Sequence, residues 1–126
     1  MDSSDGGELT GAVIGAAIEV HRVLGPGLLE SIYQKSLEIE FKIRGISVSA
    51  QARVPLIYKG YELGDDLIMD FFFPGKLVVE LKAVSAIAPV HIAQTLSYMK
   101  LSRAPLGLLI NFNVPVLKEG IKRIAL

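Results

Sequence analysis

The 126-residue sequence contains no cysteine, and its only histidines are His21 and His91. The lack of cysteine excludes disulfide bonds, thiolate zinc sites and thiol nucleophiles, and it agrees with a reducing, cytoplasmic location. Two histidines also argue against a metal site built from several imidazole groups. A site for chemistry must therefore be sought among the other polar residues.

The sequence also lacks a long apolar run. Its most apolar stretch, GAVIGAAIEVH, is interrupted by Glu19, far short of the roughly 20 apolar residues that span a bilayer. The first ten residues, MDSSDGGELT, are acidic and polar and lack the basic and apolar regions of a signal peptide. We therefore expect a soluble, cytoplasmic protein with no membrane partner.

An excess of charge of either sign is missing as well, because the formal net charge is zero. This argues against a protein that binds nucleic acid by electrostatics alone. Residues 1–70 hold six Lys or Arg against eleven Asp or Glu, whereas residues 71–126 hold seven against two. The asymmetry permits a basic face, although charges far apart in sequence can mix in space. The length fits one core, and we expect a disordered tail over residues 1–8 and a single domain over residues 9–126.

Hydrophobic periodicity predicts three helices. The first two lie over about residues 9–24 and 28–42, with Thr10 as a candidate N-cap and glycine and proline between them. A third helix, over residues 89–102, begins with a proline suited to the first turn. Four of its apolar residues should point inward: Val90, Ala93, Leu96 and Leu101.

Segments rich in β-branched and aromatic residues predict strands between these helices. Three of them, over about residues 47–60, 61–73 and 76–84, form an antiparallel meander. A continuously apolar strand over residues 106–112 should be buried inside the sheet, and residues 116–126 form a final helical turn or edge strand.

The predicted hairpin at Asp70–Ala83, DFFFPGKLVVELKA, carries charges that its apolar composition does not explain. Because side chains alternate along a strand, Glu80 and Lys82 project from the same face. A two-residue Pro74-Gly75 turn would put Asp70 and Glu80 on opposite faces, whereas a three-residue loop sets Asp70 directly opposite Glu80. The preference of Pro-Gly for a type II turn favours the longer loop, although Lys76 would then occupy a position where glycine is preferred.

In the longer-loop register the two carboxylates lie about 5 Å apart and repel unless a cation or proton separates them. Such oxygen ligands suit Mg²⁺ or Mn²⁺. A bound cation would lower the pKa of a water molecule and neutralise phosphoryl charge, and Lys82 would orient that water or stabilise the developing anion. The alternative is structural: a solvated Glu80–Lys82 ion pair, or such a pair inside an oligomer interface. Asp65 and Asp66 are rival ligands near a bend.

Asp70 followed by Glu80-Leu81-Lys82 resembles the D…(D/E)xK signature of the PD-(D/E)XK nuclease superfamily, although Met69 stands where the simplest pattern has proline. GLLESIY, or Gly27-x-x-Glu30-x-x-Tyr33, is similar to the motif that names the GxxExxY protein family. The segments IGAAIEVHRVLGPGLLES, VELKAV, AQTLSYMK and GLLINF extend this resemblance over about residues 14–124. The resemblance implies an α/β (α+β) protein with a restriction-endonuclease-like αβββαβ core: a mixed central sheet flanked by helices.

The resemblance also implies roles for individual residues. Asp70, Glu80 and the carbonyl of Leu81 would bind the metal, and Lys82 would be the catalytic lysine. Glu30 corresponds to the acidic residue that many superfamily members carry on the first core helix, near the metal.

Three further residues are candidates for positioning water or substrate. Gln94 and Tyr98 resemble a Q-x-x-x-Y element that lines the site in some nuclease branches, and their spacing of four puts them on one helical face. Tyr33 lies three residues after Glu30, a spacing that also puts the two side chains on one helical face. The tyrosines are equally compatible with core packing, and Gln94 with a surface amide; we assign His91 and His21 no ligand role.

We therefore predict a small metal-dependent nuclease that hydrolyses phosphodiester bonds of nucleic acid, with DNA favoured over RNA. The alternative is a non-catalytic nucleic-acid-binding or protein-interaction module that retains the nuclease fold. A neutral chain of this size has little surface for sequence-specific binding. A homodimer or a partner protein would enlarge it.

Overall fold

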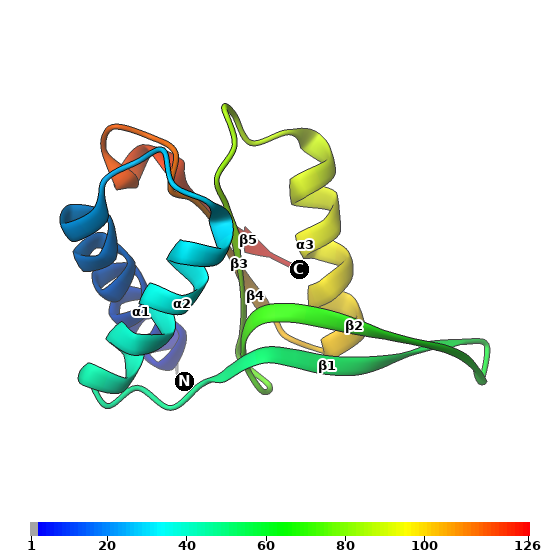
Figure 1. Cartoon of the computed structure of the whole chain (residues 1–126). Coiled ribbons are helices and arrows are strands. Elements are labelled where there is room, and N and C mark those ends of the chain that lie inside the picture. The colour runs from blue at the N-terminus through cyan, green and yellow to red at the C-terminus, as the bar shows by residue number, and fades with distance from the viewer. Residues whose placement is uncertain (1–2) are drawn as a thin grey trace.

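A computed structural model describes the backbone of residues 3–126 and the side chains from residue 7 onward. A five-stranded mixed sheet of order β1-β2-β3-β4-β5 runs through the molecule, with two helices on one face and one on the other (Figure 1). The elements are α1 (Ser3–Leu24), α2 (Glu30–Ile43), β1 (Ser49–Tyr58), β2 (Tyr61–Phe73), β3 (Leu77–Lys82), α3 (Pro89–Ser102), β4 (Leu106–Asn111), a 3-10 helix (Leu117–Gly120) and β5 (Ile121–Ala125). The predicted αβββαβ order and mixed sheet are confirmed, because β3 and β4 pair in parallel and the other neighbours are antiparallel.

The sheet separates two hydrophobic clusters. The larger one packs α1 and α2 against the sheet, and α2 contributes Tyr33, Leu37 and Phe41, whose spacing of four places them on one buried stripe. The smaller one packs α3 against the opposite face, through contacts that include Met99 and Val78. The strands between these layers are held from both sides, which gives polar groups at their ends a rigid support.

Two helix predictions differ from the structure. Helix α1 begins at Ser3 and not at Leu9, so Thr10 lies inside it, and its hydroxyl donates to the Gly7 carbonyl at 3.1 Å. Of the predicted tail, residues 1 and 2 lie outside the described residues.

The predicted inward face of α3 is correct only at Leu96, which packs against the smaller cluster, whereas Ala93 is exposed. Val90 and Leu101 are 66% and 48% exposed, whereas Thr95 and Met99 are buried. The reason lies in β4, where a Cβ at Gly107 would come within 2.6 Å of the Met99 sulfur. The missing side chain of this glycine lets the Met99 face of α3 approach the sheet.

The β2–β3 hairpin has the longer loop. Phe73 pairs with Leu77, and the Lys76 N–H donates to the Phe73 carbonyl at 2.9 Å. The positive φ that the turn requires, 75°, falls on Gly75 and not on Lys76. The register that sets Asp70 opposite Glu80 is therefore confirmed.

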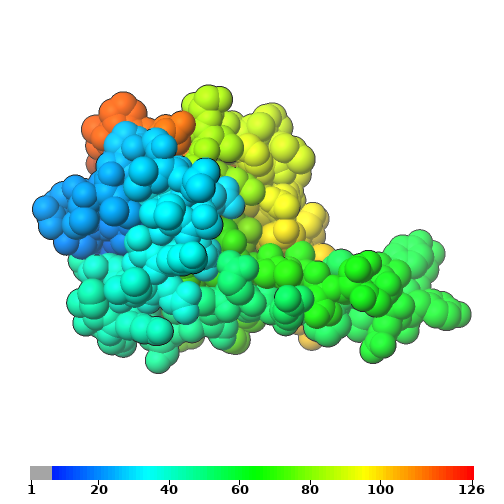
Figure 2. Space-filling model, in the orientation of Figure 1, coloured from blue at the N-terminus to red at the C-terminus, as the bar shows by residue number. Residues whose placement is uncertain are grey.

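Beyond the sheet, β1 and β2 continue as a two-stranded arm that projects from the body of the molecule (Figures 1 and 2). Its tip is a two-residue turn at Lys59 and Gly60, both with positive φ, as tight hairpins require. Asp66 lies on this exposed arm, where its Oδ2 atom is 3.8 Å from Nη1 of Arg53. No helix within residues 3–126 is long and apolar enough to cross a membrane.

Candidate active site

Asp70 and Glu80 face each other one step beyond the last regular pair of the β2–β3 ladder, Phe71 and Val79. The Asp70 N–H donates to Glu80 Oε2 at 2.8 Å, and the Leu81 N–H donates to Asp70 Oδ2 at 2.8 Å. Each carboxylate therefore accepts a backbone hydrogen bond from the opposite strand. This reciprocal bonding fixes the two side chains beside each other.

The site disfavours negative charge on both carboxylates. Glu80 is only 4% exposed, and burial, reinforced by nearby Asp70, raises its pKa to about 8 against the opposing effects of the Asp70 N–H and Lys82. Burial also raises the pKa of Asp70, against hydrogen bonding from Leu81 and the charge of Lys82. A proton or a cation between the two groups relieves this cost.

Lys82 follows Glu80 by two residues on β3, which places both side chains on the α3 face of the sheet. Its positive charge lowers the pKa values of Asp70, Glu80 and Glu30. No ion pair to Lys82 forms within the described part of the chain. The solvated Glu80–Lys82 ion pair, one of the two structural alternatives, is therefore absent from this region.

Glu30 approaches the same carboxylates from the first residue of α2. The residue as a whole is exposed, yet burial of its carboxyl group raises its pKa, and so does the charge of Asp70. Lys82, His91 and a hydrogen bond from the Ala83 backbone act in the opposite direction. The start of a helix favours an acidic side chain, and here it directs that side chain toward β2 and β3.

Helix α3 adds Gln94 and Tyr98 from the other face of the sheet. The Gln94 amide donates to the Tyr98 hydroxyl at 3.0 Å. Burial raises the pKa of Tyr98, and the charges of Glu80 and Asp70 raise it further. The phenol therefore lies close enough to both carboxylates for their negative charge to disfavour its ionisation.

Tyr33 is not brought to the carboxylates. It is fully buried, and its ring stacks on Phe112 with centroids 4.5 Å apart. Its hydroxyl donates to the Gly25 carbonyl at 2.6 Å and accepts the Leu28 N–H at 3.2 Å. These contacts anchor the loop before α2, and we leave Tyr33 out of the site proposed below.

Both histidines contact backbone groups, His21 in a distant segment and His91 within its own turn. His21 is buried, with Nε2 2.8 Å from the Val114 carbonyl, and His91 Nδ1 accepts the Ala88 N–H at 2.9 Å. The second contact satisfies a backbone donor at the start of α3.

Two glutamines that sequence reasoning missed contact Asp70. Gln34 Nε2 donates to the Asp70 carbonyl at 3.1 Å, and the Gln51 side chain, as a hydrogen-bond donor, lowers the pKa of the Asp70 carboxyl. Gln34 lies four residues after Glu30, so helical spacing offered a signal for it, but nothing in the sequence marked Gln51. A hollow of about 490 Å³ beside Asp70 is lined by Glu30, Ser31, Gln34, Lys35, Glu38, Gln51 and Asp70.

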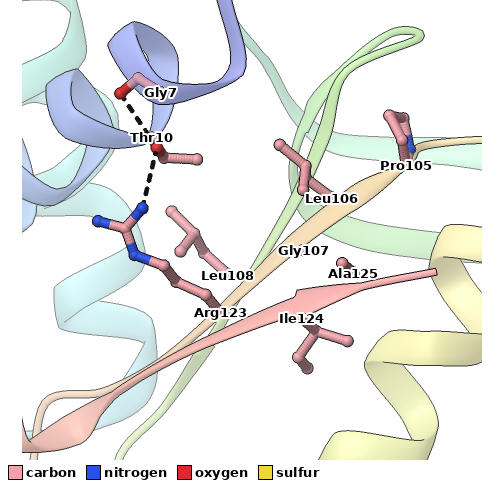
Figure 3. A pocket seen from close by; sticks show the side chains of 9 residues that line it. All are labelled: Gly7, Thr10, Pro105, Leu106, Gly107, Leu108, Arg123, Ile124 and Ala125. Atoms are coloured by element: carbon pink, nitrogen blue, oxygen red, sulfur yellow. Dashed lines mark hydrogen bonds between the residues drawn. The ribbon is translucent and has the colours of Figure 1, made fainter. Parts of the chain in front are cut away.

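A second, more apolar hollow of about 480 Å³ lies at the far edge of the sheet, where β4 and β5 meet the start of α1 (Figure 3). Leu106, Leu108 and Ile124 contribute to its lining, and Arg123 donates to the Thr10 hydroxyl at 3.4 Å across it. None of the predicted site residues lines this hollow. Of the predicted site residues, Asp70 and Glu30 line the hollow beside Asp70 instead.

The donor set around Asp70 fits a hard divalent cation, because it offers two adjacent carboxylates whose mutual repulsion the cation would relieve. Within residues 7–126, whose side chains are described, no three His, Cys, Asp or Glu side chains are grouped closely enough to hold a metal. A cation would therefore need backbone oxygen or water to complete its coordination.

Comparison with protein families gives a match over nearly the whole chain. The family model described as the PD-(D/E)XK nuclease superfamily matches residues 7–124. The matched segment includes Asp70, Glu80 and Lys82 together with the strands that carry them. Comparisons with curated proteins and with solved structures gave no match.

Proposed function

The chain belongs to the PD-(D/E)XK nuclease superfamily, and we propose that it is a metal-dependent nuclease that hydrolyses phosphodiester bonds in nucleic acid. Membership suggests nuclease activity and a nucleic-acid substrate, and nucleases of this superfamily typically use divalent metals. The observation that carries the proposal is the reciprocal hydrogen bonding that fixes Asp70 and Glu80 side by side near Lys82.

We propose Mg²⁺ or Mn²⁺ as the cation, held by Asp70, Glu80 and the Leu81 carbonyl. Glu30 is not grouped closely enough with Asp70 and Glu80 to form a three-carboxylate site, so we propose that it reaches the cation through a water molecule. When bound, the cation supplies an activated water and neutralises charge on the phosphoryl group. Lys82 donates a hydrogen bond to the attacking water or to a phosphoryl oxygen. The raised pKa of Glu80 supports this assignment, because a nearby cation makes the ionised form favourable.

Gln94 and Tyr98 are the groups we propose for positioning water or phosphate. Their mutual hydrogen bond restricts both side chains, and the phenol lies near both carboxylates. DNA is the substrate that we favour over RNA, and a cleavage assay compares the two directly.

We further propose membership in the GxxExxY family, because each residue of its motif has a physical role here. Gly27 has a φ of 95°, which favours glycine. Glu30 begins α2 and faces the carboxylates, and the Tyr33 hydroxyl holds the loop that leads to Glu30. The motif thus couples the shape of one loop to the placement of one acidic side chain.

Calorimetry with Mn²⁺ and cleavage of single- and double-stranded DNA and RNA test the proposal. Wild type should bind Mn²⁺ and cut nucleic acid, whereas Asp70→Asn and Glu80→Gln should lose both properties. Lys82→Ala should retain Mn²⁺ binding but lose about 10²-fold or more in cleavage rate. Asp66→Asn, on the exposed arm, is the matched control and should behave as wild type.

The same experiment separates the alternatives. Metal binding without cleavage of any of the four substrates would favour a non-catalytic binding module that retains the fold. Two results would contradict metal binding by Asp70 and Glu80. One is a wild-type protein that binds no Mn²⁺, and the other is Mn²⁺ binding that persists in the Asp70→Asn/Glu80→Gln double variant.

A further inference from the structure

Gln51, the third residue of β1, has a φ of 51°, a left-handed conformation that residues other than glycine disfavour. Two other non-glycine residues in the described chain share this property, and both have a local reason. Lys59 forms the two-residue turn at the tip of the arm, and Arg103 caps the C-terminus of α3. Gln51 lies in neither a hairpin turn nor a helix cap.

At the row of Gln51 the side chains of β1 and β2 change faces of the sheet. Ala50 packs with the α1/α2 cluster, whereas Ala52 packs with the α3 cluster. In β2, Phe71 and Met69 divide between the clusters in the same way. Residues two apart in a regular strand share one face, so the pleat inverts at this row in both strands.

The ladder is interrupted at the same row. Ala50 pairs with Phe71 and Ala52 pairs with Met69, but Gln51 and Asp70 between them are not paired. Asp70 instead bonds to side chains through its backbone: its N–H donates to Glu80, and its carbonyl accepts from Gln34. The inversion thus releases Asp70 from regular pairing and leaves it beside Glu80.

The Gln51 side chain completes this arrangement. As a hydrogen-bond donor it lowers the pKa of the Asp70 carboxyl group, and both residues line the hollow that also contains Glu30. A disfavoured backbone conformation therefore coincides with a contact to the carboxylate proposed to bind the cation. Strain of this kind persists where the surrounding structure fixes it, and it concentrates at functional sites.

We propose that Gln51 is a positioning residue whose side-chain amide, aimed by the left-handed backbone, holds the Asp70 carboxylate in the orientation that receives the divalent cation. This inference rests on the proposed function, because it concerns the same site. The competing explanation is that the residue serves only to invert the strands. Glycine would serve that purpose better than glutamine, because it adopts positive φ without steric cost.

Two substitutions distinguish these explanations. Gln51→Gly removes the amide and relieves the backbone, whereas Gln51→Ala removes the amide and keeps the disfavoured conformation. If the amide positions Asp70, both variants should bind Mn²⁺ about tenfold or more weakly than wild type, as loss of an outer contact to a metal ligand typically does. Their melting temperatures should differ, with Gln51→Gly above Gln51→Ala by about 2–8 °C.

Lys59→Gly is the matched control, because it relieves a left-handed residue at the tip of the arm. It should leave the Mn²⁺ affinity unchanged. Wild-type affinity in Gln51→Gly, or a loss in Gln51→Ala alone, would overturn the positioning role, since the backbone and not the amide would then matter. Absence of Mn²⁺ binding in the wild type would overturn the proposed function and this inference together. Unchanged Mn²⁺ binding in Gln51→Gly would overturn this inference alone.

Discussion

Replacing Glu80 with glutamine should stabilise the metal-free protein at alkaline pH. The carboxyl is buried, and its pKa rises from 4.5 to about 8 in the folded state. Between these values the native state holds a proton that the unfolded state has released, so the stability of the wild type falls as pH rises through this window. This pKa shift corresponds to a loss of about 5 kcal/mol in the free energy of unfolding.

Glutamine cannot ionise, and its side-chain oxygen can still accept the Asp70 N–H. We therefore expect Glu80→Gln to exceed wild type in free energy of unfolding by roughly 2–5 kcal/mol near pH 9 and to match it near pH 5. Urea denaturation in the presence of a chelator measures both values. The control is Glu62→Gln, an exposed glutamate on the arm, which should show no such difference.

A wild-type free energy of unfolding that stays constant between about pH 5 and 9 would contradict a raised pKa at Glu80. So would a Glu80→Gln variant that is no more stable than wild type at the upper end. The expected outcome is a protein that keeps a destabilising carboxylate pair because its proposed chemistry needs one, and gains stability when that pair is removed.

The remaining predictions concern residues around the site. Tyr33→Phe should lower the free energy of unfolding by about 1–2 kcal/mol, because the loop contacts of its hydroxyl are lost. Calorimetry should show a Mn²⁺ affinity within about twofold of wild type. A large loss of affinity would instead give Tyr33 a role in the site. Tyr98→Phe should slow cleavage about tenfold or more without weakening Mn²⁺ binding, and unchanged cleavage would exclude it. Ile39 and Ile43 are 58% and 72% exposed on α2, so we expect self-association through this face in sedimentation experiments, reduced in Ile39→Glu; a monomer at all concentrations would contradict this.

Much of the hairpin was predictable because its turn chemistry and its composition agree. Pro74-Gly75 favours a type II turn, and such a turn fits the three-residue loop that sets Asp70 opposite Glu80. The continuously apolar segment over residues 106–112 indicated a buried strand, and β4 lies between β3 and β5. Local signals sufficed where no distant residue changed the outcome.

Other features depend on contacts between distant segments. The rotation of α3 follows from Gly107, which lies on β4 and lets Met99 approach. The inversion at Gln51 breaks the alternation from which strand faces are predicted, and no residue type in SAQARVPLIY announces it. The family motif and the helical spacing fit Tyr33 equally well as a core residue and as a site residue. Only the contacts of its buried hydroxyl distinguish these two roles.

Crystals of the protein soaked in Mn²⁺ would show where the cation binds. Anomalous diffraction should reveal one strong peak between the carboxylates of Asp70 and Glu80, within about 2.5 Å of an oxygen of each, and the peak should vanish in Asp70→Asn. A peak elsewhere on the protein, or none in wild-type crystals, would contradict the assignment of these two carboxylates as the metal site.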